Sequence, residues 1–342
     1  MTGCCVIARP RRGRGKLSPQ KDRRAALART ELRSPRRFAP RDDATGLKLK
    51  DCMKHIGMIG IGLMGLGIAS NLVKHGHPLR VLEHAGNQPL DGLKAQGVST
   101  ARTPRELASQ VEVLILCVTG SPQVEAVLNG PDGALQGLRP GTVVIDCSTA
   151  VPASTERMAA MVQAVGGRFI DSPMTRTPKE AAEGRLNLLV GGDKALFDEC
   201  RPLLACFAEN ITHAGPIGAG HRMKLLHNYV SLGSVTLIAE AAACAQRAGI
   251  DPATFVQVLG VGGGWGAALD RLKPFLTEGD NTGLKFSIAN AHKDLSYYNT
   301  MAEDTHADRT VAEAVLRTLA QAKEEGDPNA FMPEVVTRLV AR

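Results

Sequence analysis

The sequence lacks the cysteine spacing that a metal site or a disulfide framework requires. Its eight cysteines form no Cys-X-X-Cys pair, and none stands at metal-ligand spacing from a histidine. Two of them, Cys117 and Cys147, lie inside apolar runs that are typical of strands. Because this pattern is typical of reduced thiols, we expect a cytoplasmic protein that holds no metal ion.

The sequence also lacks an unbroken hydrophobic segment. Residues 56–73 carry no charge over 18 positions, a length that suggests a membrane span, but five glycines interrupt them. We therefore expect no membrane anchor.

Most of the chain has no excess of positive charge. The net charge of +7 over 342 residues arises in residues 1–50, which hold 15 Lys and Arg against four Asp and Glu. The remaining residues hold 26 basic and 30 acidic side chains. Overall charge therefore gives little support for binding to nucleic acid or to a membrane surface.

The Arg-rich residues 1–52 are expected to be disordered, and three interpretations fit them. They have the composition of a mitochondrial transit peptide, or they form a basic arm that binds nucleic acid. In the third interpretation they are upstream sequence, and translation starts at Met53. We favour the third interpretation because Met53 leads directly into a predicted strand.

A Gly-X-Gly-X-X-Gly motif follows the first predicted strand, residues 56–59, and opens an amphipathic helix that continues to His75. A second predicted strand, residues 79–82, comes next. This order is that of a βαβ dinucleotide-binding unit, in which the glycine turn and the helix N-terminus hold a pyrophosphate. The residues expected to hold the cofactor here are Gly60, Gly62, Leu63, Met64 and Gly65.

Glu83 ends the second predicted strand and bears on the choice of cofactor. A carboxylate at this position accepts hydrogen bonds from the adenosine ribose and repels a 2′-phosphate. NAD is therefore favoured, with NADP as the alternative because the neighbouring His84 weakens the repulsion. The alternative role for Glu83 is that of a solvated acid at the end of a strand.

Predicted strands and helices continue to alternate to about residue 213. Apolar runs at 111–118 and 142–145 are typical of central strands in a parallel sheet. Residues 221–248 indicate one long Ala-rich helix, and no clear strand follows it. We predict an α/β fold with a doubly wound Rossmann domain over 53–213 and an all-helical domain over 214–342. The active site is expected in the cleft between them.

Lys224 and Asn228 stand four residues apart, so they share one face of the predicted long helix. A lysine in a cleft beside a cofactor can act as a general acid or base, because partial burial lowers its pKa towards the working range. Spacing alone favours the other interpretation, a lysine on a solvated helix face.

Five motifs occur in order between Met53 and the C-terminus, at residues 60–72, 146–152, 171–192, 218–228 and 286–295. Through them the sequence resembles the β-hydroxyacid dehydrogenases, the family of 3-hydroxyisobutyrate dehydrogenase and tartronate semialdehyde reductase. The resemblance implies that Thr149 and Lys293 lie near the cofactor, that Lys224 is the catalytic lysine and that Asn228 holds the substrate. It also implies that the helical domain forms a homodimer or homotetramer.

The sequence departs from this family at Thr175, Arg176 and Thr177, where most members have Ser-Gly-Gly. The resemblance implies that this segment binds the acid group of the substrate, with Arg176 as an added positive fork. The Arg-Thr pair resembles the variant of sulfolactaldehyde reductase, in which it faces a sulfonate. The alternatives are that Arg176 points to solvent or binds the cofactor.

Together these features predict an NAD-dependent 3-hydroxyacid dehydrogenase, or in reverse a semialdehyde reductase, acting on a small anionic substrate. A 3-sulfolactaldehyde reductase is the alternative within the family. A non-catalytic, dehydrogenase-like binding protein is the alternative from another class, and the presence of Lys224 argues against it.

Overall fold

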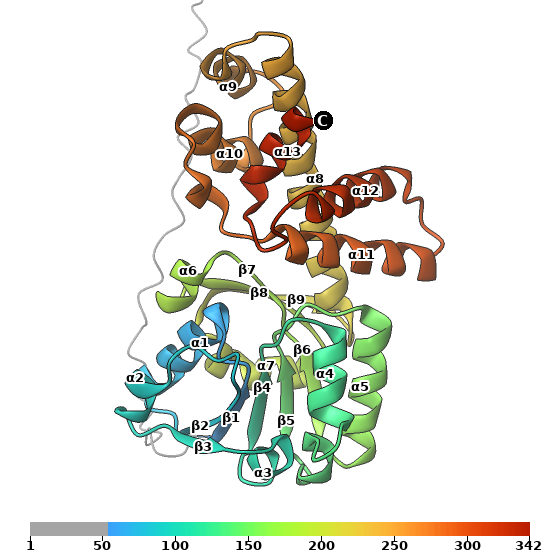
Figure 1. Cartoon of the computed structure of the whole chain (residues 1–342). Helices are drawn as coiled ribbons and strands as arrows, with labels where there is room; N and C mark the ends of the chain where they lie inside the picture. The colour runs from blue at the N-terminus through green and yellow to red at the C-terminus, as the bar shows by residue number, and fades with distance from the viewer. Residues whose placement is uncertain (1–53) are drawn as a thin grey trace, which may run out of the picture. The chain divides into compact units, whose positions relative to one another are not determined.

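The computed structural model describes residues 54–342, so the disorder expected for residues 1–52 lies outside the described residues. The first part of the described chain is an α/β region around one nine-stranded sheet (Figure 1). Its strands are β1 (Ile56–Ile59), β2 (Leu79–Leu82), β3 (Ser99–Ala101), β4 (Val113–Leu116), β5 (Val143–Asp146), β6 (Arg168–Asp171), β7 (Met174–Thr175), β8 (Leu186–Gly191) and β9 (Ala208–Gly215).

The first six strands form the doubly wound sheet that the sequence predicts. Their order is β3-β2-β1-β4-β5-β6, and every neighbouring pair is parallel. The winding reverses between β1 and β4, and ligands of such sheets bind beyond the carboxyl ends of the strands at this point. The α/β prediction is confirmed, and the glycine turn lies at the switch point.

The remaining strands extend this sheet with mixed direction. Strand β8 pairs antiparallel with β6 and β7 and parallel with β9. The two-residue strand β7 is too short for hydrophobic alternation to indicate it. Its pairing with β8 sets Thr175 opposite Asn187, so one of the predicted substrate residues belongs to the sheet.

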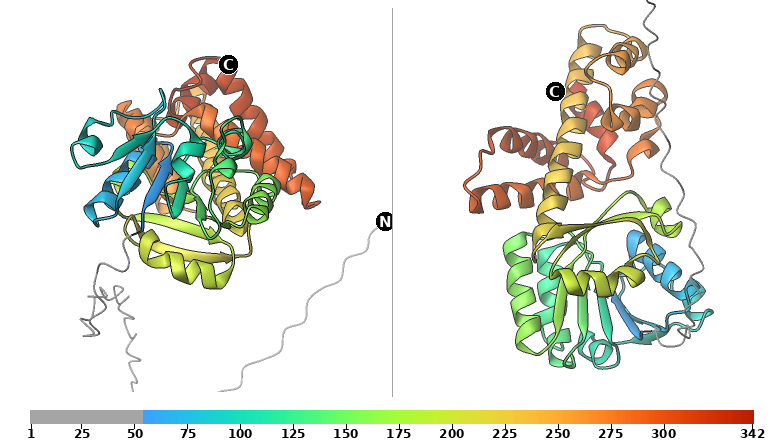
Figure 2. Two further views of the ribbon diagram at one scale, coloured as in Figure 1. Left: turned by 90° about the horizontal axis from the view of Figure 1, so that it is seen from below. Right: turned by 180° about the vertical axis from the view of Figure 1, so that it is seen from behind.

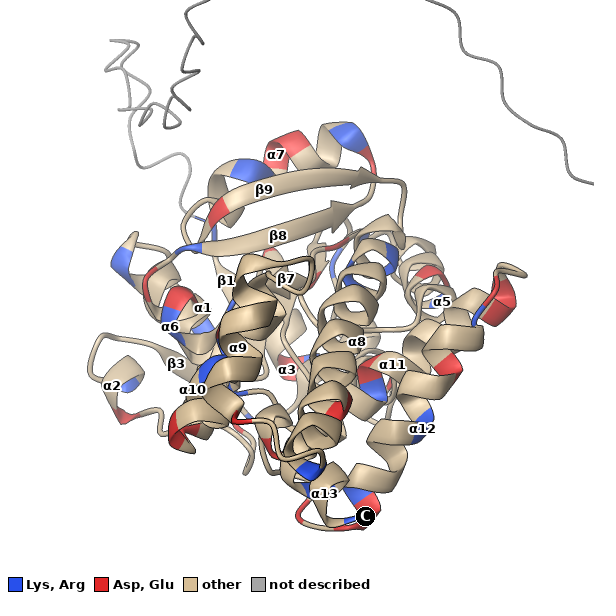
Figure 3. Ribbon diagram, turned by 90° about the horizontal axis from the view of Figure 1, so that it is seen from above, with Lys and Arg blue, Asp and Glu red and all other residues tan. Residues whose placement is uncertain are grey.

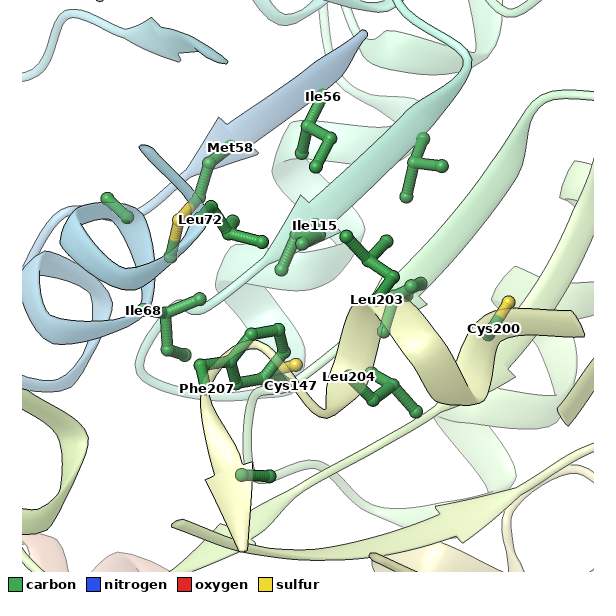
Figure 4. Packing of buried hydrophobic residues seen from close by; sticks show 14 of the residues in the cluster. Ile56, Met58, Ile68, Leu72, Ile115, Cys147, Cys200, Leu203, Leu204 and Phe207 are labelled. Carbon is green, nitrogen blue, oxygen red and sulfur yellow. The ribbon is translucent and has the colours of Figure 1, made fainter. Parts of the chain in front are cut away.

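Both faces of the sheet are covered by helices, which is why β1, β4 and β5 are buried along their whole length. One core joins these strands to α1 and α7 (Figure 4), and the other joins them to α3, α4 and α5. The helices of this region are α1 (Leu63–Lys74), α2 (Asp91–Lys94), α3 (Pro104–Ala108), α4 (Ser121–Asn129), η2 (Ala134–Gln136), α5 (Pro152–Ala164), α6 (Pro178–Ala182) and α7 (Lys194–Leu204).

The chain after β9 is helical, as predicted, and packs around the 29-residue helix α8 (Figure 2). Residues of α8, α9, α10, α11, α12 and α13 share one apolar core. The elements of this region are α8 (Ala219–Arg247), α9 (Pro252–Val261), α10 (Ala267–Glu278), η3 (Asn281–Leu284), α11 (Ile288–Asp304), α12 (Thr310–Glu324), η4 (Met332–Glu334) and α13 (Val335–Ala341).

The distribution of charge and the hydrophobicity of the helices bear on binding to nucleic acid or to a membrane. Basic and acidic residues are interspersed along helices such as α7 (Figure 3). Within residues 54–342, no helix combines the length and the apolar character that crossing a bilayer requires.

Candidate active site

The glycine turn between β1 and α1 is shaped by close backbone contacts. Gly60 has a φ of +97°, and a Cβ there would lie 2.2 Å from the carbonyl oxygen of Cys117. A Cβ on Gly65 would lie 2.0 Å from the carbonyl oxygen of Gly60. Both positions therefore require glycine.

The N-terminus of α1 is open in a way that suits an anion. Gly62 is its N-cap residue, and no side chain caps the helix. A Cβ on Gly62 would meet nothing within 4 Å, and the neighbouring Leu63 is exposed. Free backbone N–H groups at the positive end of a helix dipole fit a pyrophosphate. The geometry therefore accepts a dinucleotide at the turn formed by Gly60, Gly62, Leu63, Met64 and Gly65.

Glu83 lies at the carboxyl end of β2, on the rim of an open pocket of about 450 Å³. Its carboxylate is 3.2 Å from Lys94 Nζ. The hydrogen bond from Lys94 lowers the pKa of Glu83, and a second from Thr100 contributes. An ionised, exposed carboxylate at this rim disfavours a 2′-phosphate.

Asn87, which sequence reasoning missed, connects this pocket to the glycine turn. Its side-chain Oδ1 accepts a hydrogen bond from Ile61 N at 3.3 Å, and its Nδ2 donates to Leu82 O at 2.9 Å. The backbone of the next residue, Gln88, also donates to Ile61 O at 2.7 Å. An asparagine beside a strand end carries no sequence signal for this role.

Helix α8 is attached to the sheet at its N-terminus by a buried carboxylate. Asp171, the last residue of β6, accepts hydrogen bonds from Gly218 N at 2.7 Å and from His221 N at 2.8 Å. A Cβ on Gly220 would lie 2.3 Å from Leu189 O, so this glycine allows close packing on β8. The carboxylate also complements the positive end of the helix.

The ring of His221 is fully buried and forms a second connection between α8 and the strand ends. Its Nδ1 lies 2.8 Å from Thr155 Oγ1, and its Nε2 lies 3.1 Å from Ser148 O. Ser148 Oγ in turn accepts a hydrogen bond from Val118 N at 3.0 Å. The segment that precedes Thr149 is thereby fixed at the carboxyl ends of β4 and β5.

Lys224 lies one turn beyond His221 on α8 and is partly buried. Burial lowers its pKa from 10.5 to about 8, against the opposing effect of Asp294 and with a smaller lowering by Lys293. A lysine with this pKa exchanges a proton readily near neutral pH. The structure therefore places a titratable amine on the face of α8 that turns towards α11.

Asn228, the second residue predicted on this face, is buried and orders its neighbours. Its Nδ2 donates to Asp294 Oδ2 at 2.6 Å, and its Oδ1 lies 3.0 Å from His227 Nδ1. Lys224 and Asn228 therefore share one environment, as their spacing predicts.

Lys293 on α11 reaches the loop after β4. Its Nζ donates a hydrogen bond to the carbonyl oxygen of Thr119 and lies 5.3 Å from the centre of the Tyr297 ring. The same Nζ is 3.0 Å from Asp294 Oδ1. This contact brings the helical region against the carboxyl end of β4, and Thr149 follows the neighbouring strand β5.

The predicted substrate-acid segment does not converge on one point. Thr175 Oγ1 accepts a hydrogen bond from Asn187 Nδ2 at 3.1 Å. The guanidinium of Arg176 donates to the Glu209 carboxylate and to the Arg185 carbonyl.

Thr177 has a different local partner. It caps α6, with its backbone N donating to Glu180 Oε2 at 3.0 Å. The role of Thr175, Arg176 and Thr177 in binding an acid group stays a prediction. Among residues 54–342, no group of His, Cys, Asp and Glu has the arrangement of a metal site.

Comparisons with known proteins agree with this architecture. The model for the NAD-binding domain of 6-phosphogluconate dehydrogenase matches residues 55–215, and the NAD-binding model of NADP-dependent 3-hydroxyisobutyrate dehydrogenase matches residues 218–339. Fold and site together define the class of NAD(P)-dependent oxidoreductases that act on CH–OH groups.

Two relatives show the family, and a third protein agrees with it. The chain is 35% identical over 225 residues to NAD-dependent L-serine dehydrogenase of Pseudomonas aeruginosa, covering 65% of this chain and 74% of that protein. It is 32% identical over 275 residues to 3-sulfolactaldehyde reductase of Escherichia coli, covering 80% and 92%.

The third is a solved structure. Mycobacterium tuberculosis 3-hydroxyisobutyrate dehydrogenase with L-serine superposes with a TM-score of 0.74 at 27% identity, covering 84% of this chain and 99% of that one. The chain belongs to the β-hydroxyacid dehydrogenase family, and the predicted family, enzyme class and NAD(P) cofactor are confirmed.

Proposed function

We propose that this protein catalyses the NAD-dependent oxidation of a small 3-hydroxy acid, or in reverse the reduction of a semialdehyde, with Lys224 as general acid and base. The observation that carries the proposal is the partly buried Lys224 amine, whose pKa is lowered to about 8. It lies on a helix whose N-terminus is bonded to the end of β6.

When bound, the nicotinamide supplies hydride acceptance or donation. The residues that would hold the dinucleotide are Gly60, Gly62, Leu63, Met64 and Gly65 at the pyrophosphate, with Glu83 at the ribose and Thr149 and Lys293 towards the nicotinamide. The uncapped α1 N-terminus and the open space beside Gly62 support this assignment.

The proposed chemistry on the substrate uses two side chains of α8. In the oxidation direction the neutral Lys224 amine accepts the hydroxyl proton while the carbon-bound hydrogen leaves as hydride. In the reduction direction the Lys224 ammonium returns the proton to the carbonyl oxygen. Asn228 orients the substrate, and its buried amide is already held by Asp294 at 2.6 Å.

The experiment is NADH oxidation by the full chain against sulfolactaldehyde, methylmalonate semialdehyde, tartronate semialdehyde and succinate semialdehyde, with NADPH in parallel. We expect turnover of at least one substrate and a preference for NADH. Lys224→Ala should abolish turnover while NADH binding, followed by fluorescence, stays close to wild type. The exposed Lys273→Ala is the matched control and should keep full turnover. Retained turnover in Lys224→Ala would overturn the assigned role.

A specific observation favours 3-sulfolactaldehyde as the alternative substrate. Arg176 has a φ of +84°, a conformation that glycine adopts freely and arginine does not. An arginine kept at a strained position suggests a use for its guanidinium, and a relative of this chain is a 3-sulfolactaldehyde reductase. For this use the Arg176 guanidinium would exchange its bond to Glu209 for the sulfonate, and the Thr175 and Thr177 hydroxyl groups would leave Asn187 and Glu180 to join it.

Arg176→Gly separates this use from a structural one, because glycine relieves the backbone strain. We expect unchanged or higher thermal stability together with a raised KM for sulfolactaldehyde and little change for carboxylate semialdehydes. Equal effects on both substrates would refute the sulfonate assignment.

We propose further that the division at residues 53–213 and 214–342 reflects two domains and that the protein is a cytoplasmic homodimer or homotetramer. Strand β9 ends at Gly215 and α8 begins at Ala219, which supports the division. Met223, Leu226, Val230 and Leu237 form an exposed apolar stripe along α8, which supports assembly. Light scattering after gel filtration tests this, and a monomeric mass would refute assembly.

A further inference from the structure

Asp294 is a buried carboxylate to which the sequence assigned no role. It is 2% exposed, and its two oxygens face different partners. Oδ2 accepts the 2.6 Å hydrogen bond from Asn228, whereas Oδ1 lies 3.0 Å from Lys293 Nζ and accepts no hydrogen bond of good geometry within the described residues. Burial of a carboxylate is costly unless charged or polar partners compensate it.

The charged groups that act on Lys224 come from α11, and His227 on its own helix lies close to it. Lys293 and Asp294 belong to α11, and His227 belongs to α8, where it lies near Arg271 of α10. Burial lowers the pKa of His227, with a smaller lowering by Lys224 and Arg271. Among these described groups Asp294 alone is negative, so it alone favours the charged form of Lys224.

We propose that Asp294 is a positioning residue, which holds the Asn228 amide in place and stabilises the ammonium that forms on Lys224 during oxidation. The inference rests on the proposed function of Lys224. This role explains why a carboxylate, and not an apolar side chain, is buried between α8 and α11.

The proton balance shows what the carboxylate contributes. In oxidation the substrate loses a hydride from carbon and a proton from oxygen, and the proton converts the Lys224 amine into an ammonium beside Lys293. Without Asp294 two ammonium groups would face each other in a partly buried site. The Asp294 carboxylate offsets the charge of the Lys224 ammonium in both directions of the reaction. In oxidation this ammonium is formed, and in reduction it must be present before it transfers its proton.

The test is Asp294→Asn, which preserves shape and removes the charge. We expect the midpoint of the lysine limb in the pH profile of kcat/KM to fall by about one pH unit or more. At pH 8 the reduction rate should fall about fivefold, since a one-unit drop leaves about a tenth of the lysine protonated. Asp304→Asn, an exposed aspartate at the end of the same helix, is the matched control.

A second measurement works without turnover. Reductive ¹³C-methylation labels the lysines, and the NMR signal absent from Lys224→Arg identifies Lys224, whose titration midpoint is then compared between wild type and Asp294→Asn. An unchanged midpoint would overturn the proposal, even where Asp294→Asn is inactive. Full activity in Lys224→Ala would instead overturn the proposed function itself, so the two failures are distinguishable.

Discussion

Burial of the Lys224 ammonium should make the folded protein less stable at neutral pH, and replacing Lys224 tests this directly. Its pKa is about 8 in the folded chain against an ordinary value of 10.5 because burial removes water from the ammonium. The folded state therefore disfavours the charged form that the unfolded chain keeps. Lys224→Met retains most of the side-chain stem and removes the charge, so we expect the variant to be more stable than wild type at pH 7.

The magnitude follows from the two pKa values. Their separation of about 2.5 corresponds to about 3 kcal/mol, at about 1.4 kcal/mol for each pKa unit. Partial exposure screens the charge, so the expected gain is roughly 1–2 kcal/mol. Because the unfolded chain binds more protons between pH 8 and pH 10.5, stability rises across this window. The penalty is complete below pH 8 and disappears above about pH 10.5.

Urea unfolding at pH 7 and at pH 10.5 measures the difference between Lys224→Met and wild type. The gain should be present at pH 7 and absent at pH 10.5. Lys273→Met, which removes an exposed ammonium, controls for the change in net charge. A variant less stable than wild type at pH 7, or an equal gain at both pH values, would refute the reasoning. The expected result is the stability cost of a lysine held ready for proton transfer.

Three further predictions concern other parts of the chain. Gly67→Ala should lower the free energy of unfolding by about 1–3 kcal/mol, because the added Cβ would lie 2.5 Å from the Ala181 carbonyl carbon. Urea unfolding measures this, and Gly92→Ala is the control because a Cβ there would meet nothing within 4 Å. Glu209→Gln frees Arg176 and should lower the KM for sulfolactaldehyde a few-fold, with no change for carboxylate semialdehydes in steady-state assays. Glu83→Gln should raise kcat/KM with NADPH relative to NADH, and an unchanged ratio would count against the ribose assignment.

The architecture could be predicted because its signals are local. The glycine motif, the continuous apolar strands and the Ala-rich helix each depend on neighbouring residues. Gly60 and Gly65 illustrate this, since the spacing that identifies them also requires the close contacts that the structure shows. The residues expected at the pyrophosphate lie at the turn between β1 and α1, because the same local glycine spacing identifies them.

The partners of the site residues could not be predicted, because they come from distant parts of the chain. Asn228 and Asp294 are 66 residues apart and meet through the packing of α8 on α11. The guanidinium of Arg176 pairs with Glu209, 33 residues away on a strand whose register no local pattern sets. Lys293 was expected near the cofactor, but its bond to the Thr119 carbonyl depends on how α11 meets the sheet.

The placement of Lys224 depends on the sheet as much as on its own helix. Asp171 binds the backbone of Gly218 and His221 at the end of β6, so the first turn of α8 is fixed to the strand ends that would face the dinucleotide. Lys224 lies one turn later on the same helix, so its position relative to the strand ends is fixed as well. In the proposed reaction this arrangement would hold the groups for hydride transfer and for proton transfer in one rigid frame. The predicted acid-binding segment, by contrast, begins on the short strand β7 and not on α8, so we expect substitutions there to change the substrate without moving Lys224. That separation is why the family motif predicts the reaction of this chain more securely than its substrate.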